Sequence, residues 1–73
     1  MLKIGDYVMW SGAWGSQSPK RVRVIGIELC EAPRQKYGMP INEVSWHEVN
    51  RCVFSLSNGH WAYGTQIDPL FNL

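Results

Sequence analysis

A tight turn between two runs of alternating side chains restricts the fold of this 73-residue sequence more than any other feature. The turn lies at residues 57–59, where an Asn-Gly pair tolerates the positive φ that hairpin turns require. Before the turn, residues 52–56 alternate between two faces, and after it residues 60–63 do the same. This pattern predicts a β-hairpin that ends at Gly64 and places Trp61 in the core.

Two earlier runs of β-branched and aromatic residues predict the rest of a sheet. Residues 7–10 carry apolar groups on both faces, and a second strand starts near Arg21, where arginine and valine alternate. From Ile25 to Leu29 the apolar set shifts by one position beside Gly26. In a pattern of period two, this shift indicates a β-bulge or a sharp bend. A small barrel needs such a bend, because one strand must cross both of its halves.

Breaker residues predict the connections between these strands. Residues 31–42 contain two prolines and a glycine, so we expect a long loop there. Ser45 with a glutamate three residues later matches a capping box and predicts one helical turn over residues 46–49, with a strand through Val44 and Trp46 as the alternative. Residues 65–67 indicate a short 3₁₀ turn. Residues 68–71 indicate a last short strand, which its proline confines to a sheet edge.

Together these elements predict an all-β domain with one short helical turn. The order of five short strands, with a long early loop and a bent second strand, resembles a small five-stranded SH3-like barrel. Residues 5–8 (Gly-Asp-Tyr-Val) followed by residues 21–27 are similar to the opening of KOW- and Tudor-type barrels. Residues 61–70 resemble the close of short uncharacterised proteins of bacteria and their phages. The barrel resemblance implies a binding surface of aromatic residues between two loops.

Length and charge limit the class of protein. We expect residues 1–73 to form a single domain, which at this size buries only about 60% of the surface of its unfolded chain. Large aromatic rings help to fill so small a core. The net charge of +1 gives no overall attraction to nucleic acid or to a membrane. Without a long apolar run or a signal-peptide pattern, we expect a soluble cytoplasmic protein with no membrane partner.

The sequence offers little support for catalysis or metal binding. We expect Cys30 and Cys52 to be reduced and buried, with a single bridge between them as the alternative. These cysteines, His47 and His60 lack the close ligand pairs of zinc sites in small domains. Cys52 and His60 could form a nucleophile pair across the hairpin, but a cysteine on the apolar face would be buried and inert. We therefore expect no enzymatic activity, no metal, no cofactor and no small-molecule substrate.

A tryptophan in an uncharged loop is the strongest indication of function. Trp14 lies among small and polar residues at 11–19, where its ring either folds back over the core or anchors a partner. Tyr7, Tyr37 and Trp61 would be the other aromatic candidates between two barrel loops. These features favour a protein partner or a second copy of the chain. If Trp14 is an anchor, the Trp14→Ala variant should lose binding but little stability.

Basic residues beside this loop indicate an alternative function. Cations next to aromatic rings suit single-stranded DNA or RNA, and binding through phosphates weakens with salt whereas apolar anchoring does not. Arg34 and Lys36 add further positive charge near the second long loop. We expect a non-catalytic binding module for a protein, or alternatively for a nucleic acid. Its expected partner-binding residues are Trp14, Tyr7, Tyr37, Lys20, Arg21 and Arg23.

Overall fold

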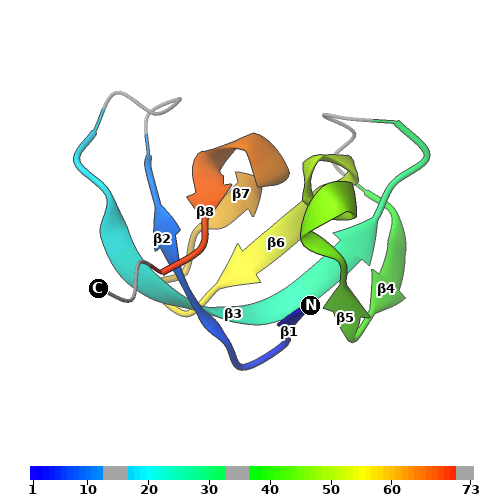
Figure 1. The fold of residues 1–73 in the computed structure, drawn as a ribbon, viewed down its shortest axis with the longest axis horizontal. Coiled ribbons are helices and arrows are strands. Elements are labelled where there is room, and N and C mark those ends of the chain that lie inside the picture. The colour runs from blue at the N-terminus through cyan, green and yellow to red at the C-terminus, as the bar shows by residue number, and fades with distance from the viewer. Residues whose placement is uncertain (13–16, 33–36, 71–73) are drawn as a thin grey trace.

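The computed structural model describes residues 1–12, 17–32 and 37–70, which form a strongly curled antiparallel sheet (Figure 1). Three residues of the sequence-based proposals, Trp14, Arg34 and Lys36, lie outside the described residues. In chain order the strands are β1 (Leu2–Lys3), β2 (Tyr7–Trp10), β3 (Lys20–Leu29), β4 (Met39–Ile41), β5 (Glu43–Val44), β6 (Cys52–Leu56), β7 (Trp61–Tyr63) and β8 (Ile67–Asp68). Two 3₁₀ segments, η2 (Trp46–Arg51) and η3 (Gly64–Gln66), complete the elements.

The main sheet curls because its two end strands are neighbours in the sequence. Its strand order is β7-β6-β3-β2-β8, and β4 pairs with the free side of β3 near the C-terminal end of that strand. The short segment η3 joins β7 directly to β8, the two ends of this path. Strands β1 and β5 form a separate pair. The result is an all-β half-barrel with short 3₁₀ turns, which confirms the predicted fold class.

Strand β3 carries the bulge that the sequence predicts. Val24 lies opposite Leu56, but Gly26 lies opposite Ser55, so one residue of β3 has no counterpart on β6. That residue is Ile25, and its side chain is exposed rather than part of the buried set. The expectation that Ile25 would join the apolar face is therefore wrong, because the bulged residue is turned out of the ladder. The apolar set resumes with the next buried side chain, Ile27.

The core lies inside the curl of the sheet. Ile27, Phe54 and Ala62 form one continuous inward row across β3, β6 and β7, and all three are buried. Trp10 at the end of β2 is also buried, with 7% of its surface exposed. Cys52 joins the same core cluster, as the alternation of the hairpin predicts.

Trp61 does not lie in this core, and that expectation is wrong. Because side chains alternate along a strand, the burial of Ala62 forces Trp61 to the outer face. There it is 45% exposed and meets the ring of Tyr63 edge-on at 5.0 Å between centroids. The hairpin turn itself is confirmed, with Gly59 at a φ of 83°.

The connecting segments are more ordered than the sequence indicates. The predicted long loop at 31–42 contains β4, an edge strand in which Pro40 lies opposite Glu28. An edge position tolerates a proline because one side of the strand needs no N–H donor. At the C-terminus, β8 occupies Ile67–Asp68 and ends before Pro69, so the last strand is shorter and earlier than predicted. The turn before it, η3, begins at Gly64.

The predicted helical turn is present as the 3₁₀ segment η2. Ser45 caps it, since its Oγ accepts a hydrogen bond from the His47 N–H at 3.2 Å. The side chain of Glu48 pairs instead with Arg51 at 3.3 Å, so it does not complete the reciprocal half of a capping box. The segment therefore keeps its N-terminal cap but extends two residues further than predicted, to Arg51.

Candidate binding site

An open cavity lies beside the N-terminal half of β3. Its volume is about 620 Å³. We call it the Trp10 cavity, and the described residues that line it are Trp10, Gln17, Lys20, Arg21, Val22, Asn58 and His60. These residues come from the end of β2 with Gln17 of the loop that follows it, the start of β3, and the turn between β6 and β7. The cavity therefore lies where three separate parts of the chain meet.

Trp10 forms the aromatic wall of this cavity. Its indole ring stacks on the imidazole of His60, with 5.1 Å between ring centroids and 29° between planes. The indole Nε1 of Trp10 is buried and has no hydrogen-bond partner, the only such side-chain atom among the described residues. A buried donor left in this state costs about 1–3 kcal/mol. Trp10 therefore lines the cavity and also carries a buried N–H group without an acceptor.

The edge of β3 is open next to the cavity. Strand β6 pairs with β3 only from Val24 onward. The backbone N–H and C=O of Arg23 form hydrogen bonds with Ser57, which follows β6. The N–H of Val24 points the other way, since it donates to the carbonyl of Asp6 beside β2. Because backbone groups alternate in direction along a strand, the N–H and C=O of Arg21 point away from β2. Within the described part of the chain, no strand pairs with that edge of Lys20–Val22.

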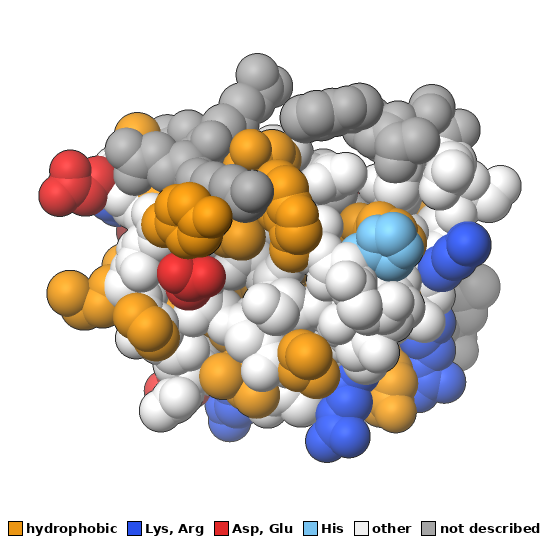
Figure 2. Space-filling view, turned by 180° about the vertical axis from the view of Figure 1, so that it is seen from behind, with side chains coloured by type: hydrophobic (Ala, Val, Ile, Leu, Met, Phe, Trp, Pro, Cys, Tyr) orange, Lys and Arg blue, Asp and Glu red, His pale blue; other side chains and the backbone are white. Residues whose placement is uncertain are grey.

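Positive charge gathers around this edge. Lys20, Arg21 and Arg23 are all exposed, and the first two line the Trp10 cavity. Its described lining contains no Asp or Glu. Figure 2 shows most of the visible Lys and Arg side chains on one side of the molecule and the Asp and Glu side chains on the other. On the face seen in this view, the charges of the two signs are therefore separated.

Two of the predicted binding residues hold each other in place on the outer face of β2 and β3. The guanidinium of Arg21 lies 4.3 Å from the centre of the Tyr7 ring, a cation–π contact. Nearby, Nε of Arg23 donates to the carbonyl of Gly5 at 3.1 Å. The structure therefore brings together Tyr7, Lys20, Arg21 and Arg23.

Tyr37 lies elsewhere, near the opposite end of β3. It is 76% exposed and lines a second cavity of about 430 Å³ together with Leu29, Met39 and Arg51. The two long loops leave β3 at opposite ends of this strand (Figure 1). Tyr37 is therefore not part of the Trp10 cavity.

Cys30 and Cys52 are buried thiols that are not joined in a disulfide. Burial raises the pKa of the Cys52 thiol to about 11, helped by the nearby Cys30 and Glu48. Burial also raises the pKa of Cys30, with the negative charge of Glu28 adding to it. Both thiols are therefore held in the protonated, unreactive form at neutral pH.

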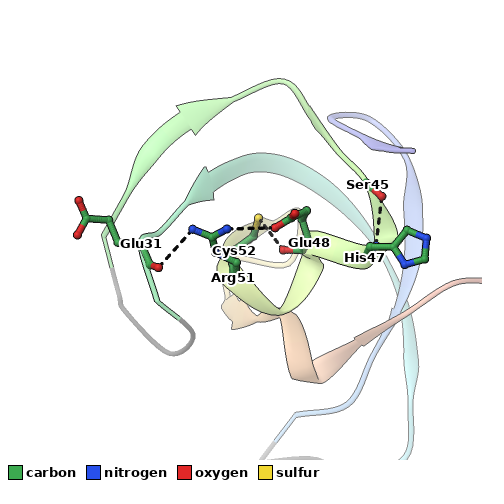
Figure 3. A network of polar contacts seen from close by, with 6 residues as sticks. All are labelled: Glu31, Ser45, His47, Glu48, Arg51 and Cys52. Atoms are coloured by element: carbon green, nitrogen blue, oxygen red, sulfur yellow. Dashed lines mark hydrogen bonds and ion pairs between the residues drawn. The ribbon is translucent and has the colours of Figure 1, made fainter.

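The surroundings of Cys52 are structural (Figure 3). Its Sγ donates to the carbonyl of Glu48 at 3.6 Å, and Arg51 bonds both the Glu48 carboxylate and the carbonyl of Glu31. His60 lies beyond the other end of β6, where its carbonyl accepts from the Leu56 N–H. The structure does not bring Cys52 and His60 together as a nucleophile pair. No group of three or more metal-ligating side chains occurs among residues 1–12, 17–32 and 37–70.

Sequence reasoning missed the two rings that define the cavity. Trp10 was one of several apolar residues in a short strand, and nothing in its local pattern separated it from Val8. His60 follows a turn, and no second candidate metal ligand lies close to it in the sequence. Their meeting depends on the curl of the sheet, which brings the end of β2 to the turn after β6.

The class of protein defined by these features is a small all-β half-barrel with an open, basic cavity beside an unpaired strand edge. No protein-family model matches the chain, and no curated protein and no solved structure matches it either. In the described ranges, no helix has the length and apolar character needed to cross a membrane.

Proposed function

We propose that this protein is a non-catalytic binding module that holds a protein partner at the Trp10 cavity. The observation that carries the proposal is the combination of aromatic wall, basic rim and unpaired strand edge in one place. Aromatic and arginine side chains are the usual anchors of protein interfaces. The curled half-barrel also supports assignment to the SH3-like barrels, whose members bind partners through aromatic surfaces.

The charge of the site defines the kind of partner. Lys20 and Arg21 line the cavity, and no acidic side chain among the described lining residues offsets them. A partner that presents carboxylates would be attracted, whereas a basic partner would be repelled. The proposed partner is therefore a protein with an acidic segment.

A peptide selection tests this function. Random peptides displayed on phage would be selected against the native protein and against a double variant, Lys20→Glu with Arg21→Glu. The proposal expects enriched peptides that bind the native protein saturably and do not bind the double variant. Lys3→Glu is the matched control, because Lys3 is an exposed cation on the separate β1–β5 pair. No enrichment, or equal binding to the double variant, would overturn the proposal.

Single-stranded nucleic acid is a second candidate, favoured by the cations on the outer face of β2 and β3. Against it, bases need exposed rings for stacking. One face of Tyr7 is already covered by Arg21, and Trp10 is buried under His60. Titration with single-stranded DNA, double-stranded DNA and RNA at low and high salt, followed by tryptophan fluorescence, separates the two functions. Saturable quenching that salt reverses would favour the nucleic acid.

A further inference from the structure

We infer that the partner binds by strand addition: an extended acidic peptide pairs with the open edge of β3 at Lys20–Val22 and places alternate side chains into the Trp10 cavity. This inference rests on the proposed function and specifies its mode. In strand addition, main-chain hydrogen bonds supply affinity and side-chain pockets supply specificity. The structure offers both at the same edge.

The main-chain groups are available at Arg21. Strand β3 runs from Lys20 to Leu29, but β6 covers its edge only from Val24. Ser57 occupies the edge of β3 at Arg23. The Ser57 N–H donates to the Arg23 carbonyl at 2.9 Å, and the Ser57 Oγ accepts from the Arg23 N–H at 3.1 Å. The next outward-pointing pair belongs to Arg21, and an extended peptide in line with β6 would meet it. Such a peptide would continue the sheet where β6 stops.

The side-chain pocket is the Trp10 cavity itself. A strand added at this edge has every second side chain on the side of the cavity. A carboxylate entering there would lie near Lys20 and Arg21, the two cations that line the cavity. Charged hydrogen bonds of this kind are stronger than neutral ones.

The same charges argue against a second copy of this chain as the occupant. Open strand edges tend to pair with each other, and natural proteins often block this with positive side chains on the edge. If two copies paired through β3, Lys20 and Arg21 of one would face the same cations of the other. An acidic peptide at the same edge would instead be attracted by Lys20 and Arg21.

Amide hydrogen exchange measured by NMR on the intact protein tests the inference. The probe is a short capped peptide in which glutamate and valine alternate. We expect it to slow exchange of the Arg21 amide by about tenfold or more, the equivalent of one stable hydrogen bond. The Val22 amide is the internal control, because it already points toward β2 and should change little. A peptide with lysine in place of glutamate, and one N-methylated at alternate amides, should both fail to bind.

The outcomes separate the inference from the function on which it rests. Binding of the N-methylated peptide with equal affinity, or binding that leaves the Arg21 amide unprotected, would overturn strand addition. If the selected peptides still required Lys20 and Arg21, the protein-binding function would stand with a different mode. If the glutamate–valine peptide and all displayed peptides failed to bind, both proposals would be overturned. Dimerisation that protects the Arg21 amide would identify a second copy as the occupant and also overturn the inference.

Discussion

The imidazole of His60 stacks on the indole of Trp10, with 5.1 Å between their centroids. This contact joins the end of β2 to the turn that follows β6, two parts of the chain that no strand pairing connects directly. His60 is exposed on its outer side, whereas Trp10 is almost completely buried. The stacked pair therefore links the surface of the cavity to the core beneath it.

Replacing His60 should measure how much this stack contributes to the free energy of unfolding. His60→Ala is expected to lower the free energy of unfolding by about 0.5–1.5 kcal/mol, the range for aromatic pairs. His60→Phe keeps a flat ring and should recover most of that loss. Urea denaturation followed by tryptophan fluorescence measures both. Equal stability of His60→Ala and the native protein would show that the stack is not a stabilising contact.

Truncation to alanine should destabilise the protein far more at Trp10 than at Trp61. Trp10→Ala removes a buried ring and is expected to cost about 3–5 kcal/mol, enough to unfold a marginal domain. Trp61 is 45% exposed and meets Tyr63 edge-on, so Trp61→Ala should cost about 1 kcal/mol. Thermal unfolding by circular dichroism compares the two variants. A greater loss from Trp61→Ala would contradict its outer position.

Gly64 should tolerate a side chain far less well than Gly59. A Cβ at Gly64 would overlap the carbonyl of Val49, which is rigid backbone of η2. Gly64→Ala is therefore expected to cost about 3 kcal/mol or more. Gly59 has open space around it but a φ of +83°, so Gly59→Ala should cost about 1–2 kcal/mol. The reverse order in chemical denaturation would mean that η2 can move away from η3 at little cost.

The Cys52 thiol should make stability depend on pH in the alkaline range. Its pKa rises on folding from 9.0 to about 11, so the folded state favours the protonated thiol. The resulting stability is fully present below pH 9 and is lost as the pH rises toward 11. Other groups titrate in the same range, so the comparison is with Cys52→Ala. The native protein should lose more of its urea stability between these pH values than the variant does, and parallel losses would contradict the shift.

The sequence predicts the strands whose side chains alternate regularly, and it predicts the hairpin turn from its Asn-Gly pair. The hairpin at Gly59, the shift of pattern at Gly26 and the cap at Ser45 are all local signals, and the structure confirms each one. Strand β4 was not predicted, because its residues include a proline and it forms by pairing with β3 rather than by its own preference. Propensity is a weak guide for such edge strands.

The candidate site was less predictable than the fold. Lys20, Arg21 and Tyr7 were identified because charge and aromatic residues stand out in the sequence, and the structure groups them. The prediction exchanged the buried and exposed faces of β7. Alternation along a strand shows which residues share a face, but it does not show which face is buried. Tertiary packing decides in favour of Ala62, and Trp61 follows to the outside.

The length of β3 has a consequence for how the chain assembles. This strand pairs with β2, β4 and β6, so it serves both halves of the curled sheet. A cut between β3 and β4 would leave Val24 and Ile27 on one fragment and their partners Leu56 and Phe54 on the other. Each fragment would lose buried partners that the other supplies. Folding must therefore bring together residues far apart in sequence, and strand pairing of this non-local kind slows assembly.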